Sequence, residues 1–367
     1  MKKFLAVLLI LVLSMSMFTA CGGGTEEEAA PAAEPLVVGF LYVGPIGDTG
    51  FNFAHDQGRI ALEEHFDGAV KTIYQENVAE TMQDVTNAAK NMIDQGAKVI
   101  FTTSFGFMDA TEALAAEYPD VIFMHFSGYK MNDTNFGNYF GAMEEARYLS
   151  GIVAGMKTQT NKIGYVAAFP YTELLIGINA FTLGAQSVNP DATVSVIWTN
   201  SWGDPAKEKE AANALLDQGC DVMAQHVDST GPQIAAQERG AWAVGYNTDS
   251  SAAAPEAFMT APLWNHGVYY IDQVQKVIDG TWTPESYYGT MADGYIGLLP
   301  LTAVAPEGAQ AKVDEVQAKI LAGEFPIFTG PIYDQNGTEV VPAGKSLNRE
   351  EIWQMNYLVK GVQGSLQ

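Results

Sequence analysis

Cysteine is scarce in this 367-residue sequence, which contains only Cys21 and Cys220. Cys21 lies in a cleavage motif near the N-terminus, so Cys220 would stand alone in the mature chain and no internal disulfide is expected. Cys220 lies between an expected helix and an expected strand. We interpret it as a small buried hydrophobe, a common role for an unpaired cysteine.

Basic residues are also scarce. Lysine and arginine number 19 against 43 aspartates and glutamates, which gives a formal net charge of −24. A chain this acidic, with no basic stripe, is repelled by DNA and RNA, so no nucleic-acid partner is expected. The acidity favours solubility but identifies no ligand.

Motifs for catalysis and metal binding are missing as well. The sequence contains no HExxH or HxH spacing, no cysteine cluster, no GxSxG motif and no GxxxxGK[ST] loop. An enzyme such as a nucleoside hydrolase would need a metal-binding aspartate cluster, which Asp48-Thr49-Gly50 does not supply. We therefore expect a protein that is not an enzyme and that carries neither a metal nor a cofactor.

The N-terminal region has the pattern of a secretory signal. Two lysines precede an apolar segment, residues 4–13, and the small residue Ala20 precedes Cys21. The apolar segment is too short for a membrane span, so residues 1–20 are expected to be a cleaved signal peptide. A cysteine in this position resembles the bacterial lipoprotein signal, in which the cysteine is lipidated. Ordinary secretion with a free Cys21 is the alternative.

Residues 21–35 have the composition of a tether. Its acidic residues and its alanine/proline run cannot build a packed core, so the segment is expected to be disordered. A lipid on Cys21 followed by this tether would hold a folded domain at the extracytoplasmic face of a membrane.

The remaining chain, about 330 residues, is long enough for two lobes. Apolar segments of strand length alternate with segments of helical periodicity, which predicts an α/β fold with parallel sheets covered on both faces. The expected strands are 36–43, 70–74, 98–103, 121–126, 162–168, 193–198, 221–225, 241–245, 259–264 and 295–301. The expected helices are 53–66, 81–95, 141–156, 205–218, 266–279, 307–322 and 349–359. A hairpin is expected over 330–341, with Asn336-Gly337 at its turn.

A short sequence repeat supports two similar lobes. Asp94-Gln95-Gly96 and Asp217-Gln218-Gly219 each end an expected helix and lead into an expected strand. In both places the glycine stands where a helix C-cap favours it. Two α/β lobes in tandem would explain why the same context occurs twice.

The turn after the first expected strand carries unusual chemistry for a connection. Asp48, Phe51 and Asn52 lie close together in a glycine-containing segment. One interpretation is a ligand site in which Phe51 stacks on an aromatic ring while the polar pair bonds its edge. The alternative is a turn with a capping aspartate, because aspartate and glycine favour turns for local reasons. The glycine spacing does not match the dinucleotide-binding pattern.

Polar and aromatic residues follow several other expected strands. Because ligands bind at the carboxyl ends of strands in open α/β sheets, loops of this composition favour a shared pocket. For any single loop, local capping is the alternative. The loop residues that we expect at the pocket are Ser104, Phe105, Asp109, Phe169, Trp202, Asp228 and Asp249.

Five segments together resemble the basic membrane protein (BMP) family of ABC-transporter solute receptors. They read VGFLYVGPIGDTGFNFAHDQGR, TTSFGFMD, INAFTLGAQSVNP, WTNSWGDPAKE and ERGAWAVGYNTD. The resemblance runs from about Leu36 to the C-terminus. It implies the type I periplasmic-binding fold, in which two Rossmann-like lobes are joined by a three-segment hinge. Known members of the family bind purine nucleosides or purine bases.

The resemblance also implies a division of the chain. The N-terminal lobe is expected to comprise 36–138 and 262–290, and the C-terminal lobe 139–261 and 291–330. Residues 331–367 are expected to form a hairpin and a helix that pack on the lobes.

Carried over residue by residue, the resemblance assigns ligand contacts. Asp48 and Asn52 match the positions that bond the edge of the base. Phe51 and Trp202 match the aromatic positions that sandwich the base from opposite lobes. Asp109 lies in the matching strand-end loop of the first lobe.

Two positions bear on whether the ligand is a free purine base or a nucleoside. Asp249 matches the position that bonds the ribose in nucleoside receptors. Those receptors carry a lysine directly after the strand that here is Met259 to Leu263, and this chain has Trp264 at that position. An indole in place of that lysine removes a donor and fills the sugar's volume, so the resemblance implies a free base such as adenine.

The sequence therefore predicts a lipid-anchored, monomeric, extracytoplasmic receptor on the cell membrane. It would capture a purine base between two lobes and deliver it to an ABC permease and its ATPase. The alternatives are a purine nucleoside receptor of the same family and a ligand-sensing receptor of a signalling system.

Overall fold

The computed structural model describes residues 34–366. The predicted signal peptide, Cys21 and most of the predicted tether lie outside the described residues. Within the described residues, no helix combines the length and the apolar character needed to cross a membrane.

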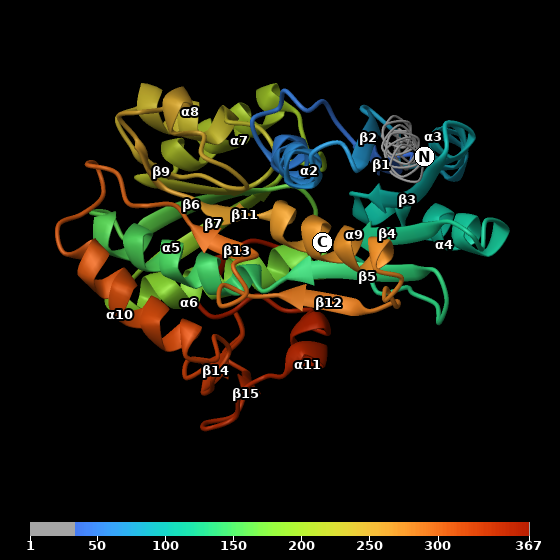
Figure 1. Cartoon of the computed structure of the whole chain (residues 1–367). Helices are drawn as coiled ribbons and strands as arrows, with labels where there is room; N and C mark the ends of the chain where they lie inside the picture. Colours follow the sequence, from blue (N-terminus) through green and yellow to red (C-terminus); the bar gives the residue numbers. More distant parts are fainter. Residues whose placement is uncertain (1–33, 367) are drawn as a thin grey trace, which may run out of the picture. The chain divides into compact units, whose positions relative to one another are not determined.

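Strands β1 to β5, together with the later strand β12, build a six-stranded parallel sheet with strand order β12-β5-β4-β3-β1-β2 (Figure 1). Most of its strands are apolar on both faces, as expected for a parallel sheet between two helix layers. The strands are β1 (Leu36–Leu41), β2 (Val70–Gln75), β3 (Ala97–Thr102), β4 (Ile122–Phe126), β5 (Phe136–Gly141) and β12 (Ser286–Gly289). The helices that follow or precede these strands are α2 (Phe51–Phe66), α3 (Met82–Asp94), α4 (Met108–Glu117) and α9 (His266–Ile278), with a short 3-10 turn at Phe105–Phe107.

A second six-stranded parallel sheet has the order β10-β9-β8-β6-β7-β16. Its strands are β6 (Lys162–Ala167), β7 (Thr193–Trp198), β8 (Val222–His226), β9 (Trp242–Val244), β10 (Phe258–Thr260) and β16 (Val362–Gln363). Its helices are α5 (Met143–Lys157), α6 (Thr172–Val188), α7 (Pro205–Asp217), α8 (Gly231–Glu238) and α10 (Ala309–Leu321), with a 3-10 turn at Ser251–Ala253. The two parallel sheets confirm the predicted α/β class.

Helices α5 and α6 pack backbone against backbone in the core of the second lobe. A Cβ added at Gly151 would lie 2.1 Å from the carbonyl oxygen of Phe181, and one at Gly184 would lie 2.0 Å from that of Tyr148. Glycine is therefore required at both positions for this close approach. Because α6 is apolar nearly all round, its sequence lacks the one-sided periodicity by which a helix is recognised. The expected elements did not include it.

The chain crosses between the two sheets three times, after β5, after β10 and after β12. Between the second and third crossings, β11 (Pro262–Trp264) pairs antiparallel with β13 (Ile296–Leu298). The prediction of a single strand over 259–264 is thus wrong. The segment forms two short strands, because the chain leaves the second sheet at Ala261. We use "first lobe" and "second lobe" below for the parts built on the first and second sheets.

The C-terminal segment confirms one expectation and corrects another. Strands β14 (Ile332–Tyr333) and β15 (Glu339–Val341) form the predicted hairpin, with Gly337 at a φ of 83°. The helix expected over 349–359 ends early, because α11 covers only Arg349–Trp353. Beyond it, Asn179 accepts a hydrogen bond from the Val359 N–H (2.9 Å), and tertiary contacts of this kind replace the helical ones.

Candidate functional site

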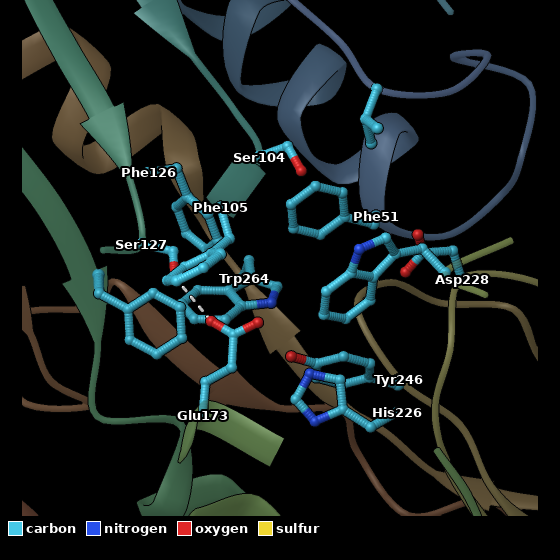
Figure 2. Close-up of a pocket in the computed structure, with 13 residues that line it drawn as sticks. Phe51, Ser104, Phe105, Phe126, Ser127, Glu173, His226, Asp228, Tyr246 and Trp264 are labelled. Carbon is cyan, nitrogen blue, oxygen red and sulfur yellow. Dashed lines mark hydrogen bonds between the residues drawn. The ribbon is translucent and has the colours of Figure 1, made fainter. Parts of the chain in front are cut away.

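A cavity lies between the two lobes, where about 430 Å³ is free of protein atoms when the adjoining open solvent is included. Both lobes line it, at the carboxyl ends of their strands, where open α/β sheets bind ligands (Figure 2). Its lining residues are Val43, Phe51, Ser104, Phe105, Phe126, Ser127, Phe140, Glu173, Trp202, His226, Asp228, Tyr246 and Trp264.

Two aromatic residues line the cavity from opposite lobes, Phe51 from the first (Figure 2) and Trp202 from the second. Phe51, the first residue of α2, is held edge-on by His55 and Phe126, with ring centroids 4.6 and 5.6 Å away. Trp202 lies in the loop after β7 and is held edge-on by Phe169 at 5.2 Å. Each ring is therefore fixed by aromatic neighbours of its own lobe before any ligand binds.

Trp264 forms the wall of the cavity at the hinge strand β11. Its side chain is buried and stacks on His266, with ring centroids 5.5 Å apart and planes 10° apart. Phe126 and Phe140 contact it edge-on, each with centroids at 5.2 Å. Its indole Nε1 has no hydrogen-bond partner among the described residues. The Tyr246 hydroxyl is a neighbour of this indole and interacts with it, which lowers the pKa of Tyr246 against the larger upward effect of burial.

The cavity also has polar oxygen atoms, which come from Ser104, Ser127, Glu173, Asp228 and Tyr246. The Ser127 hydroxyl donates to Glu173 Oε2 at 2.7 Å. The Ser104 hydroxyl donates to Glu80 Oε1 at 2.5 Å, which leaves the serine oxygen free to accept. Asp228 is buried, and its backbone N–H donates to the Trp202 carbonyl at 2.8 Å.

Burial controls the protonation of the acidic and basic groups here. It raises the pKa of Glu173 to about 7. Burial, reinforced by the neighbouring carboxylates of Asp48 and Glu208, raises the pKa of Asp228 well above its usual value. The pKa of His226 is lowered well below its usual value by burial and by the positive charge of Arg147. The histidine is therefore neutral at physiological pH.

Arg147 supports the cavity from behind. It is fully buried, and its guanidinium lies 3.7 Å from the ring centre of Tyr246. Its Nη1 donates to the Gln225 carbonyl at 2.8 Å. Arg147 does not line the cavity, but the cation–π contact fixes the Tyr246 ring that does.

The lobes touch one another around the cavity. The Thr248 hydroxyl of the second lobe donates to the Thr49 carbonyl of the first at 2.5 Å. A Cβ added at Gly50 would lie only 1.9 Å from the Asp228 carbonyl oxygen, so the two backbones meet where only glycine fits. The rings of Phe105 and Tyr171 also meet, with centroids 5.6 Å apart. These contacts describe a closed arrangement of the two lobes.

The structure brings six of the sequence-predicted positions to the cavity: Phe51, Ser104, Phe105, Trp202, Asp228 and Trp264. Phe169 does not line the cavity, but its ring contacts the Trp202 ring edge-on. Whether any of these residues touches a ligand stays a prediction.

Asp48 and Asn52 line a neighbouring cavity that shares Val43, Trp202 and Asp228 with the first. Their polar atoms are engaged within the turn. Asp48 accepts from the backbone N–H groups of Gly50 (2.8 Å), Asn52 (2.9 Å) and Phe53 (3.0 Å) and from the Asn52 side chain (2.7 Å). Asn52 Oδ1 accepts from the Gly44 N–H at 3.1 Å. These contacts favour the capping alternative.

Asp109 and Asp249 do not line the cavity. Asp109 pairs with Lys130 at 2.8 Å, and its side chain is 69% exposed. Asp249 is exposed and accepts from the Ser251 N–H at 3.0 Å, which is a local turn contact. A ligand contact at either residue stays a prediction.

The cavity also contains residues that the sequence analysis missed: Val43, Phe126, Ser127, Phe140, Glu173, His226 and Tyr246. Ser127, His226 and Tyr246 stand at or just after strands and follow the same rule that selected the other loop residues. Phe140 lies in β5, and Glu173 lies in α6, and neither element was expected.

Within the described residues, no group of three or more histidine, cysteine, aspartate or glutamate side chains is arranged to hold a metal ion. What the cavity offers is stacking surface, hydroxyls and carboxyls. Those groups suit the binding of a flat molecule with polar edges.

Two parallel-sheet lobes with a cavity between them are the architecture of two-lobed solute receptors. A solved solute-binding protein of an ABC transporter system from Aeropyrum pernix K1 has the same fold. Its TM-score is 0.69 and its sequence identity 20%, and the match covers 82% of this chain and 93% of that chain. This likeness confirms the predicted fold.

Residues 36–328 match the family described as ABC transporter substrate-binding protein PnrA-like (Bmp). The chain is 43% identical over 338 residues to a purine-binding protein of Brucella abortus, covering 92% of this chain and 96% of that protein. It is 36% identical over 351 residues to a putative ABC transporter glucose-binding protein of Haloferax volcanii, covering 95% and 84%. The chain therefore belongs to the Bmp family of ABC-transporter substrate-binding proteins, which confirms the resemblance.

Proposed function

We propose that this protein binds a free purine base, such as adenine, between its two lobes for uptake by an ABC transporter. The observation that carries the proposal is the aromatic cavity itself, with Phe51 and Trp202 on opposite lobes and Trp264 as its hinge-side wall. A purine ring has two flat faces for stacking and a polar edge for the carboxyls and hydroxyls. The name of the Brucella abortus relative supports the same class of ligand.

Two observations favour a base over its nucleoside. Trp264 lines the cavity, and the resemblance matches it to a lysine of the family's nucleoside receptors, so its indole would fill room that a sugar needs. Asp249, which matches the ribose-binding position, lies outside the cavity. A ribose buried here would leave hydroxyls without partners, and each unsatisfied polar group costs about 1–3 kcal/mol.

The closed arrangement supports a receptor that traps its ligand. Because the cavity draws residues from both lobes, a ligand touches all of them only when the lobes are closed, and binding therefore stabilises the closed form. We propose that the lobes are built on the two sheets, with the crossings near residues 141, 261 and 290 as the hinge. The proposal includes a monomeric receptor, lipid-anchored through Cys21 on the extracytoplasmic face and served by a permease and an ATPase.

Parallel titrations test the choice of ligand. We expect adenine to bind more tightly than adenosine by about tenfold or more, since a packed site rejects added atoms firmly. Guanine, guanosine and glucose complete the panel, and mass spectrometry of ligand released from the purified protein provides an independent test. Equal or tighter binding of the nucleosides would overturn the base proposal in favour of a nucleoside receptor.

A further inference from the structure

Glu173 lines the cavity and connects the two lobes, because it lies in one lobe and accepts a hydrogen bond from the other. It lies in the first turn of α6, in the second lobe, and its carboxyl is directed into the cavity beside Trp264 (Figure 2). Ser127, which donates to Glu173 Oε2 at 2.7 Å, follows β4 in the first lobe. This hydrogen bond therefore spans the cleft and forms when the lobes close.

Ser127 is held in a conformation that serines rarely adopt. Its φ is 68°, and its side chain is buried. A non-glycine residue in the left-handed region is strained, and such strain persists only where the surroundings enforce it. Here the strained residue is the one whose hydroxyl reaches across to Glu173.

The second carboxyl oxygen of Glu173 is free. Among the described residues, the hydrogen bonds of this carboxyl comprise only the one from Ser127 to Oε2, so Oε1 is left for a bound molecule. No lysine or arginine lines the cavity. A bound molecule can therefore supply a hydrogen for Oε1 to accept.

We propose that Glu173 determines specificity among purine bases by accepting a hydrogen bond from an exocyclic amino group, while Ser127 holds the same carboxyl across the closed cleft. This inference rests on the proposed function. It assigns the ligand class as amino-bearing bases such as adenine, over oxo-bearing bases such as hypoxanthine, which place a carbonyl oxygen at the corresponding position.

The reason is the polarity of the contact. Burial raises the pKa of Glu173 to about 7, so at pH 8 the carboxyl is mostly ionised and can only accept. The amino group of adenine donates a hydrogen bond to the Glu173 carboxylate. The carbonyl oxygen of hypoxanthine is an acceptor, as the carboxylate is, so no hydrogen would lie between the two oxygens. The neighbouring carboxylate of Glu80 adds negative charge near Glu173 and strengthens this preference.

Glu173→Gln tests the polarity directly. The glutamine side chain has one oxygen, and if that oxygen accepts from Ser127, the amide NH2 faces the ligand and donates. At pH 8 we expect the wild-type protein to bind adenine over hypoxanthine by about tenfold or more, given the cost of an unmade buried hydrogen bond. In Glu173→Gln this ratio should fall by about tenfold or reverse.

Two further variants separate selectivity from closure. Ser127→Ala removes the hydrogen bond across the cleft but leaves the carboxyl, so both bases should weaken together and their ratio should persist. Glu144→Gln is the matched control: Glu144 is buried and its pKa is also raised to about 7, but it accepts from Tyr288 and does not line the cavity. It should leave the ratio unchanged.

Titration calorimetry with adenine and hypoxanthine gives separable outcomes. If wild-type protein binds neither base, the proposed function falls and this inference falls with it. If it binds them but Glu173→Gln changes the ratio by less than about twofold, the inference alone is overturned. Should Glu173→Gln fail to fold, Glu173→Asp withdraws the carboxyl by one methylene, and an unchanged ratio in that variant would equally overturn it.

Discussion

Two helices start at opposite walls of the cavity, and each has an acidic residue at its beginning. Asp48 precedes α2 in the first lobe, and Glu173 lies in the first turn of α6 in the second. The carboxylate of Asp48 accepts four hydrogen bonds, all from within its own turn. That of Glu173 accepts from Ser127, a residue of the other lobe.

The comparison shows that the same chemical group serves two purposes at the two walls. Asp48 organises local backbone, because it binds the N–H groups of the first turn of α2, which have no partner inside the helix. Glu173 has a free oxygen in the cavity and a contact that depends on lobe closure. Asp48, which lies in a recognisable sequence motif, therefore caps its own helix. Glu173, which lies in no such motif, has an oxygen available to a ligand.

Gly50→Ala should give the largest effect, because it acts on the contact between the two walls. A Cβ there would lie 1.9 Å from the Asp228 carbonyl oxygen, a backbone atom that cannot move aside independently. We expect the variant to resist closure and to lose adenine affinity by about 100-fold or more in calorimetry.

The control for this variant lies in the same turn. A Cβ at Gly47 meets nothing within 4 Å, so Gly47→Ala should bind like the wild type. Wild-type affinity in Gly50→Ala would mean that the lobes do not meet at this point when ligand is bound.

Trp202→Ala removes the stacking face of the second-lobe wall. Base–aromatic stacking is worth roughly 1–3 kcal/mol, so adenine affinity should fall by about 5- to 150-fold. Trp242→Ala, which removes a half-buried indole that packs on Lys157 away from the cavity, should leave affinity unchanged. An unaffected Trp202→Ala, together with an unaffected Phe51→Ala, would refute the aromatic clamp.

Much of the fold was predictable because buried parallel strands are recognisable in the sequence as short apolar segments. The expected strand 193–198 coincides with β7, and most others match within one or two residues. Helices α4, α6 and α8 and strand β5 were not predicted. β5 contains two glycines and an asparagine, and α6 is buried all round, so neither shows the periodicity that marks a half-exposed element.

The candidate site was predictable only in part. The rule that ligands meet strand ends found Trp202 and Asp228, because that rule depends on topology alone. It also selected Asp109 and Asp249, because loop composition cannot tell whether a side chain points inward or out to solvent. Glu173 could not be found in this way, because its role depends on a hydrogen bond from Ser127, which lies 46 positions away in the sequence.

Asp48→Ala should chiefly reduce stability. The substitution leaves first-turn N–H groups of α2 without their acceptor, and loss of a helix cap costs about 1–2 kcal/mol. Urea denaturation should show a lower midpoint, and all bases should weaken by a similar factor. If Asp48→Ala instead changed the adenine to hypoxanthine ratio at constant stability, Asp48 would contact the base, and the contrast between the two walls would disappear.

The smallest effects are expected at Asp109 and Asp249, although the family resemblance assigns both to the site. Asp109 is paired with Lys130 on the surface, and exposed ion pairs contribute only about 0.2–1 kcal/mol to stability. Asp249 is exposed and bonds the backbone of its own turn. Alanine at either position should therefore change adenine affinity by less than about twofold, since neither side chain reaches the cavity.

Asp249→Ala also probes the choice between base and nucleoside. If the cavity holds only a base, the substitution should leave adenine and adenosine titrations equally unaffected. A loss of adenosine affinity alone, by about tenfold, would mean that Asp249 turns inward to a ribose when a nucleoside binds. In that case the loop after β9 would have to rearrange, because its present contacts direct the carboxylate to the Ser251 N–H and to solvent. The preference for the free base would then rest on Trp264 alone.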